Sequence, residues 1–130
     1  MGIPIPKAKV KKPNYANWVN VDRARPLYDA HLQPVQPGEL GRYDPLKKSW
    51  KVWPLPKSRE GCYAVYVDDK DMVWVSDWPA NAIHRFDPAT ERFASFPSNR
   101  PRADVRQMLG RPGEVWAAES GTDRLVLIKE

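Results

Sequence analysis

The amino-acid sequence predicts an all-β protein, a partial β-propeller of about three four-stranded antiparallel blades. The segment LGRYDPLKKSWKVWPLP, which starts at Leu40, is echoed by IHRFDPATERFASFPS, which starts at Ile83, 43 residues later. A second pair, MVWVSD and EVWAAE, aligns Trp74 with Trp116 at a spacing of 42 residues. No stretch shows a helical period. Repeats of this length, each with several short strands, are typical of propeller blades.

Eight positions match like for like at the 43-residue spacing, which is hard to produce by chance. They are Leu40–Ile83, Arg42–Arg85, Tyr43–Phe86, Asp44–Asp87, Pro45–Pro88, Trp50–Phe93, Trp53–Phe96 and Pro54–Pro97. The aromatic members recur with the blade period. We expect them to pack between blades rather than to form a stacking surface for carbohydrate or nucleic acid.

Each unit is expected to contain short strands joined by tight turns. CYAVYVD and MVWVSD are rich in β-branched and aromatic residues, and the polar DDKD between them predicts a turn. A later pair, AIHRFD and RFASFP, is joined by an Asp87-Pro88 turn. Proline presets φ for such a turn, and the aspartate can bond the backbone beyond it. Asp44-Pro45 predicts the same turn in the preceding unit.

The chain is expected to begin with a basic, Pro-rich arm over residues 1–16, followed by blades over residues 17–130. The blades are predicted at about 17–56, 62–97 and 105–130. In the first, the second strand is placed near residues 26–29 and precedes an enlarged loop. The last has only three strands. Propellers generally have about four to eight blades, so open blade faces and strand edges are expected to drive self-association or pairing with neighbouring blades.

Charge and composition narrow the functional classes. The net charge is +5, but four lysines fall within the first twelve residues, and the remainder holds 17 basic and 16 acidic residues. Such a short basic run indicates a solubilising arm more than a nucleic-acid interface. No run is long enough for a transmembrane span, and no signal-peptide core is visible, so we expect a cytoplasmic protein or one whose export signal has been removed. Cys62, the single cysteine, allows no internal disulfide.

The phrases ELGRYDPLKKSWKVWPLP, MVWVSDWPANAIHRFDPATERFASFP and GRPGEVWAAESGTDRLVLI resemble the streptogramin lyases. The resemblance covers about residues 38–130 and is strongest over the last 60. It implies a seven-bladed propeller of which this stretch forms the last blades. It also implies a magnesium-assisted lyase that opens a cyclic depsipeptide of the streptogramin B type by elimination at the ester linkage.

Strand geometry predicts where a site would lie. In an antiparallel pair, the start of the first strand and the end of the second share one edge of the blade. Tyr63 is therefore expected beside Asp77, and Arg106 beside Glu119. Both pairs would lie at one mouth of the central channel, where loops from several blades converge.

The resemblance implies roles for these residues. Glu119 matches the acid that helps to hold Mg²⁺ in the family, and Asp77 is a second candidate ligand, since a hard cation prefers carboxylate oxygens. The alternative is that both acids cap strand ends. Family members with known activity carry histidines where this chain has Tyr63 and Arg106. An arginine is always protonated, so it cannot readily act as a base, although it can bind a carboxylate or an oxyanion.

Two histidines remain as candidates. His31 lies in the enlarged loop two residues after Asp29, the strand-end acid of the first blade, and is the candidate base; a loop histidine is more commonly structural or solvated. His84 is expected on a strand face away from the mouth, as a packing or surface residue. Two functions stay open: a lyase-like enzyme, from which we expect little or no activity in isolation, and a non-catalytic interaction or assembly module.

Overall fold

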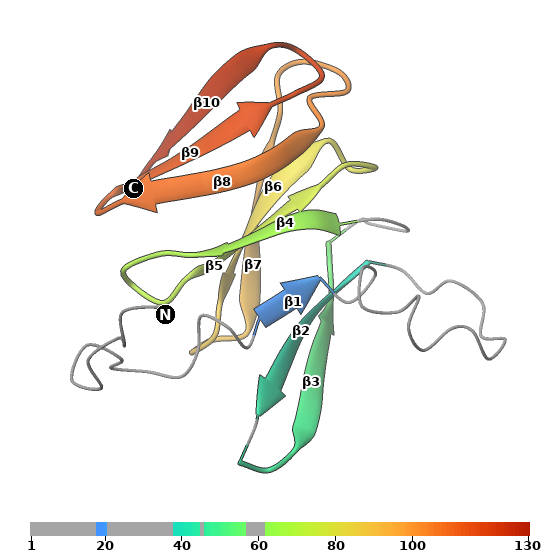
Figure 1. Ribbon diagram of the computed structural model, residues 1–130, viewed down its shortest axis with the longest axis vertical. Helices are drawn as coiled ribbons and strands as arrows, with labels where there is room; N and C mark the ends of the chain where they lie inside the picture. The colour runs from blue at the N-terminus through green and yellow to red at the C-terminus, as the bar shows by residue number, and fades with distance from the viewer. Residues whose placement is uncertain (1–17, 21–37, 45, 57–61) are drawn as a thin grey trace, which may run out of the picture.

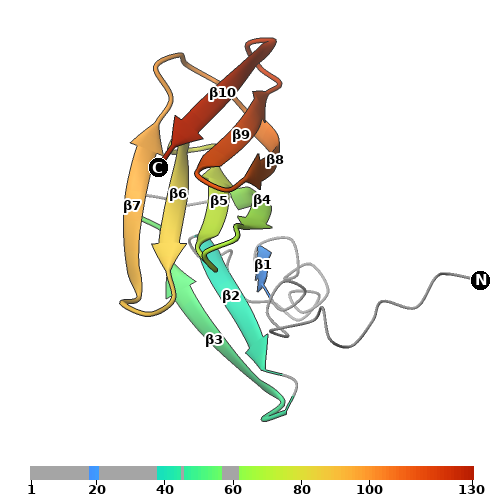
Figure 2. The same ribbon diagram turned by 90° about the vertical axis from the view of Figure 1, so that its left-hand side faces the viewer.

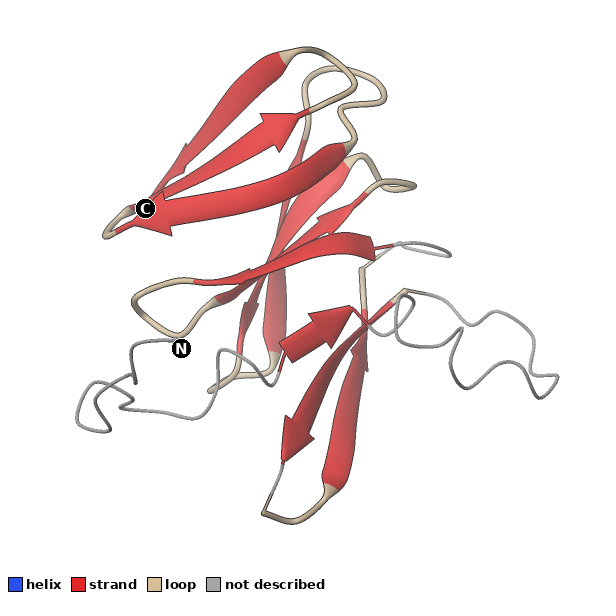
Figure 3. Ribbon diagram, viewed as in Figure 1, coloured by secondary structure: helices blue, strands red, loops and turns tan. Residues whose placement is uncertain are grey.

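The computed structural model describes residues 18–20, 38–44, 46–56 and 62–130. Within these ranges the protein consists of strands and loops, without a helix (Figure 3). It accordingly contains, in these ranges, no helix suited to crossing a membrane. The strands form three antiparallel sheets that follow one another along the chain, as blades do (Figure 1). The predicted fold class is therefore confirmed.

Each sheet is a meander in which strands adjacent in sequence are hydrogen-bonded. The first blade contains β1 (Trp18–Asn20), β2 (Glu39–Asp44) and β3 (Ser49–Pro54). The middle blade contains β4 (Cys62–Val67), β5 (Val73–Asp77), β6 (Ala82–Asp87) and β7 (Arg92–Pro97). The last blade contains β8 (Val105–Arg111), β9 (Glu114–Glu119) and β10 (Arg124–Lys129).

Strand register shows that the blades repeat residue by residue. Trp74 pairs with Arg85 in the middle blade, and Trp116 pairs with Leu127 in the last. Trp18 pairs with Arg42 in the first blade, so a tryptophan occupies the same ladder position in all three. The equivalence of Trp74 and Trp116 was predicted; that of Trp18 was not, because no phrase around it matches the other two.

The first blade corrects one detail of the prediction. β1 lies directly against β2, with Val19 opposite Gly41, so residues 18–20 take the place that the sequence had suggested for residues 26–29. The arm over residues 1–16, the segment 26–29 and the candidate base His31 lie outside the described residues.

Asp44 and Asp87 both accept hydrogen bonds from the backbone beyond them, as expected. The Oδ1 of Asp87 accepts a hydrogen bond from the backbone N–H of Ala89 at 2.8 Å, and the Oδ1 of Asp44 accepts bonds from the N–H groups of Lys47 and Leu46. These bonds favour the ionised carboxylate, so they hold the pKa of Asp87 and of Asp44 below its usual range.

Figure 2 shows the three blades from the side. Two apolar layers hold them together. We use front face for the side of a blade that meets the next blade along the chain, and rear face for the opposite side. The layer between the first and middle blades contains Leu40, Leu55, Cys62, Val67, Val73, Val75 and Phe86. The layer between the middle and last blades contains Trp74, Ile83, Val105, Met108, Val115 and Ala117. Cys62 is buried, and its Sγ donates a hydrogen bond to the carbonyl oxygen of Glu39.

Candidate functional site

The strand ends at which the sequence predicts a channel mouth are those of β5 and β9. Cys62, next to Tyr63, pairs with Asp77, and Val105, next to Arg106, pairs with Glu119. Both inner strands shift register just after these pairs, so Arg106 falls within a β-bulge between Val105 and Gln107. A bulge re-aims the side chain of its extra residue. It turns Arg106 out of the regular ladder at the edge where the two blades meet.

Arg106 lies on an aromatic platform formed by Tyr63 and Trp78. The two rings are stacked, with centroids 4.7 Å apart and planes inclined by 10°. The guanidinium carbon of Arg106 lies 5.3 Å from the centroid of Trp78 and 6.0 Å from that of Tyr63, within cation–π range. Its Nε donates a hydrogen bond to the Oγ of Ser120 at 3.1 Å. These contacts orient the exposed cation.

Arg106 therefore bonds Ser120, not Glu119. The sequence predicts that the arginine and the acid lie within one side chain's reach of each other at the mouth, where Arg106 binds anions. They share the same end of the blade, but in the described ranges no carboxylate forms an ion pair with Arg106. The bulge removes Arg106 from the ladder position opposite Glu119, which Val105 takes instead.

Asp77 is buried at the end of β5 and both of its oxygens are engaged. Oδ1 accepts a hydrogen bond from the backbone N–H of Ala80 at 3.0 Å. Oδ2 lies 2.9 Å from the Nε2 of His84, and the Nδ1 of His84 lies 2.9 Å from the Oγ of Ser95. The chain Asp77–His84–Ser95 thus connects three neighbouring strands of the middle blade. His84 is a packing histidine, but the expectation that it lies away from the mouth is wrong, since it bonds a mouth acid directly.

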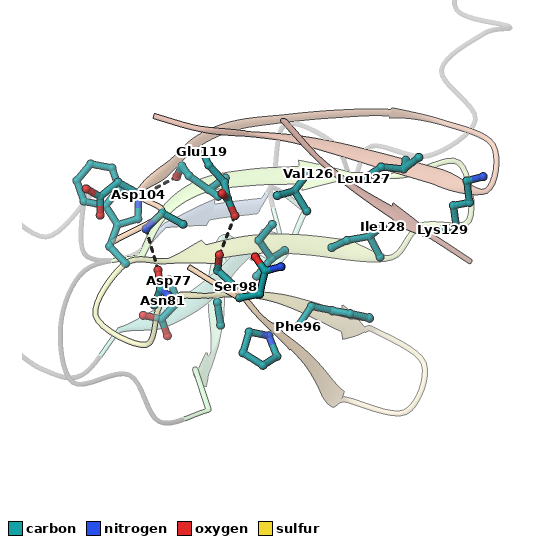
Figure 4. A pocket seen from close by; sticks show the side chains of 17 residues that line it. Asp77, Asn81, Phe96, Ser98, Asp104, Glu119, Val126, Leu127, Ile128 and Lys129 are labelled. Carbon is teal, nitrogen blue, oxygen red and sulfur yellow. Dashed lines mark hydrogen bonds between the residues drawn. The ribbon is translucent and has the colours of Figure 1, made fainter. Parts of the chain in front are cut away.

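Glu119, at the end of β9 in the last blade, is also buried with both carboxylate oxygens hydrogen-bonded. Its Oε1 accepts a hydrogen bond from the Oγ of Ser98 at 2.8 Å. Its Oε2 accepts one from the Oγ1 of Thr122 at 2.7 Å. Ser98 follows β7 and Thr122 lies in the turn after β9, so this carboxylate ties the middle blade to the last one (Figure 4).

These acids do not suit a Mg²⁺ ion as they lie. Magnesium takes oxygen ligands in near-ideal octahedral geometry and keeps several waters. Here all four oxygens of Asp77 and Glu119 already accept hydrogen bonds from protein groups, and both side chains are buried. Among the described residues, no three His, Cys, Asp or Glu side chains gather at one place. The arrangement fits the alternative reading, in which both acids satisfy strand ends.

A cleft of about 500 Å³ opens between the middle and last blades beside the aromatic platform. Trp78 belongs to both features, because it lines the cleft and lies beneath the guanidinium of Arg106. The labelled side chains of Val126 and Ile128, from β10, lie across from Phe96 of β7 in Figure 4. The cleft therefore combines an apolar wall with a polar end at Asp77, Ser98 and Glu119.

Trp78 is the residue that sequence reasoning missed. It directly follows the end of β5, and its Nε1 donates a hydrogen bond to the carbonyl oxygen of Val105 at 2.8 Å, across the blade boundary. An aromatic residue next to a strand-end acid in DWPAN was the available signal. Of the predicted residues, the structure brings together Tyr63 and Arg106 through this ring, and it keeps Asp77 and Glu119 in the polar end of the cleft.

Comparison with solved structures supports the fold. A selenomethionine-substituted virginiamycin B lyase from Staphylococcus aureus matches with a TM-score of 0.60 and 16% identity, over 73% of this chain and 35% of that one. A catalytically inactive variant of the same lyase with quinupristin gives 0.56 and 16% identity, over 71% and 34%. A streptogramin B lyase gives 0.57 and 16% identity over the same shares. The chain thus spans about a third of the length of these structures.

Sequence comparisons add little to the site. A family model described as glycosyltransferase WbsX matches residues 13–56, about a third of the chain. This match ends before Tyr63, so it includes neither the platform nor the cleft. No curated protein matches the chain significantly.

Proposed function

We propose that this chain forms a non-catalytic ligand-recognition sector of a propeller resembling the streptogramin lyases. It recognises a small carboxylate-bearing ligand at the mouth through Arg106, and it does not carry out the magnesium-assisted elimination. The single observation that carries the proposal is the oriented guanidinium of Arg106, which lies within cation–π range of both stacked rings, Tyr63 and Trp78.

The chemistry of Arg106 favours an anionic ligand. A guanidinium has five N–H donors in a fixed plane, and only the Nε donor is engaged by Ser120 among the described residues. The four N–H donors on the terminal nitrogens match the two oxygens of a carboxylate. Because Ser120 and the rings already orient the side chain, binding costs less rotamer entropy than it would at an unsupported arginine.

The adjoining cleft favours an apolar group beside that carboxylate. Trp78 connects the cation to a space lined by Ile83, Phe96 and Val126. A ligand that places its carboxylate on Arg106 would direct a neighbouring side chain along Trp78 into the cleft. Peptides and acylated amino acids with an aromatic or aliphatic side chain have this combination of groups.

Elimination needs a base and a stabilising cation, and the described residues of this sector do not supply them as the lyase chemistry would need. Removing a proton beside an ester carbonyl requires a base, and developing charge on the carbonyl oxygen requires a cation or strong hydrogen-bond donors. Arg106 and Tyr63 stand where the family resemblance places histidines, and Asp77 and Glu119 use their oxygens for strand-end hydrogen bonds. Arg106 could stabilise an oxyanion, but it cannot serve as the base.

The proposal is tested by titrating the protein with N-acetylphenylalanine and, as a neutral control, N-acetylphenylalanine amide. We expect the carboxylate to shift the NMR resonance of the Arg106 Nε–H, and the amide to bind at least about tenfold more weakly. Arg106→Gln should abolish the preference for the acid. A matched variant, Arg92→Gln, changes an exposed arginine that pairs with Asp87 at the opposite end of the middle blade and should leave the preference intact. Equal affinity for the acid and the amide would refute the proposal.

A further inference from the structure

The front face of the last blade presents apolar side chains in ladder register. Leu109 of β8, Trp116 of β9 and Leu127 of β10 are direct cross-strand partners, so they lie side by side. Leu109 is 70% exposed, Trp116 is 39% exposed, and Leu125, two residues along from Leu127 on the same face, is 70% exposed. Single hydrophobic residues scattered over a surface are normal, but three large exposed ones on the same sheet face indicate an interaction surface.

The middle blade shows what such a face contacts when it is covered. Tyr66, Trp74 and Ile83 occupy the positions equivalent to Leu109, Trp116 and Leu125, and they belong to the apolar layer against the last blade. Trp74 is fully buried there. The rear face that covers it contributes aliphatic residues, among them Val115 and Ala117. The front face of the last blade therefore has the side-chain pattern of a blade interface.

The rear face of the first blade is the complementary open surface. Tyr43 and Trp50 are cross-strand partners with ring centroids 5.2 Å apart, and Val52 lies two residues further on the same side of β3. Trp50 is 48% exposed and Val52 is 45% exposed. The chain thus carries both halves of an additional blade interface, one at each end of its series of blades.

The middle blade again shows how this rear surface is used. Phe86 and Phe93 are the equivalents of Tyr43 and Trp50, and Phe86 is fully buried against the first blade. There the ring of Phe86 lies 4.8 Å from that of Trp53 and 4.8 Å from that of Phe93. An aromatic pair on the rear face is therefore the element that receives the front face of a preceding blade within this protein.

We infer that the front face of the last blade binds the rear face of the first blade of a second copy of this chain, in a head-to-tail arrangement. The occupant is a second copy because the two open faces match faces that are covered inside the chain. The front face of the last blade resembles the front face of the middle blade, and the rear face of the first blade resembles the rear face of the middle blade. A heterologous contact of this kind closes into a ring when the rotation per copy allows it. The three described blades of each of two copies would together supply about six, which lies within the range of known propellers.

The experiment measures the mass of the full chain by sedimentation and native mass spectrometry. We expect a dimer that dissociates on dilution. Trp116→Glu and Trp50→Glu should each weaken the dimer at least about tenfold, since each places a charge in one half of the interface. Leu125→Glu and Val52→Glu are second variants at the same two faces. Leu46→Glu is the control, because Leu46 is 93% exposed in the β2–β3 turn and lies on neither face.

Mixing the two tryptophan variants separates head-to-tail pairing from the alternatives. Trp50→Glu protein retains an intact last blade and Trp116→Glu protein retains an intact first blade, so the mixture should regain a heterodimer through one interface. A dimer formed by two last blades would instead be lost in Trp116→Glu and would persist in Trp50→Glu. Mixing the two variants would then give no heterodimer, and this result would overturn the inference. A folded wild-type monomer at all concentrations would also overturn it, and would assign the face to another blade or another protein.

Discussion

The Nε2 of His84 lies 2.9 Å from the Oδ2 of Asp77, and both side chains are buried in the middle blade. Asp77 pairs with Ala82 in the ladder, so His84 is its diagonal neighbour on the same sheet face. In the last blade the equivalent acid, Glu119, is bonded by Ser98 and Thr122, while Val126 takes the ladder position of His84. The two mouth acids thus occupy one structural position and are satisfied by different partners.

His84→Val should destabilise the protein by about 1–3 kcal/mol, because it leaves a buried carboxylate oxygen of Asp77 without its partner. Asp77→Ala should cost a similar amount, since it leaves His84 and the N–H of Ala80 without an acceptor. The double variant should cost less than the sum of the two, as expected when both partners of a buried bond are removed. Urea unfolding of the four proteins measures this. Strict additivity would show that the pair contributes no coupling.

The repeat supplies a matched pair of tryptophans for a second prediction. Trp74 is fully buried and its Nε1 donates a hydrogen bond to the Oδ2 of Asp68 at 2.8 Å, whereas Trp116 is partly exposed. Trp74→Ala should lower the free energy of unfolding by about 3–5 kcal/mol, and Trp116→Ala by about 1 kcal/mol or less. Both are measured in a Trp50→Glu background, so that self-association does not contribute. Similar losses at the two positions would contradict the assigned burial.

The same repeat explains how much of the fold was predictable. The middle and last blades could be predicted because VWVSD and EVWAAE are apolar segments whose tryptophans, Trp74 and Trp116, recur 42 residues apart. The strand at Trp18 could not be aligned in this way, because the sequence around it has no phrase that matches the others, and only backbone pairing with β2 reveals its equivalence.

The site was less predictable, because it depends on register. The diagonal contact of His84 with Asp77 follows only once Asp77 is known to pair with Ala82. The bulge at Arg106 breaks the alternation that placed it opposite Glu119, and no residue type in ADVRQM marks such a bulge. The platform also needed Trp78, which lies in a loop where strand patterns give no direction.

The Asp87 turn gives a prediction for pH. The backbone N–H of Ala89 is the main cause that lowers the pKa of Asp87 in the folded protein. A lowered folded-state pKa contributes stability that is fully present above the unfolded value of about 3.9, and that is lost as the pH falls through the folded value. Acidification from about pH 5 to pH 2.5 should therefore lower the urea midpoint of the wild type more than that of Asp87→Asn. If the urea midpoints of the two proteins fell by the same amount with pH, the Asp87 turn would contribute nothing to acid sensitivity.

The central claim is that this sector recognises a ligand without catalysing elimination, and incubation with a streptogramin B and Mg²⁺ tests it most directly. Mass spectrometry should find the cyclic depsipeptide intact, because Arg106 cannot act as a base and the oxygens of Glu119 and Asp77 are engaged by protein groups. Linear product that requires Mg²⁺ and disappears in Glu119→Ala would contradict the claim. It would assign Glu119 to the metal and the base to a residue outside the described part of the chain.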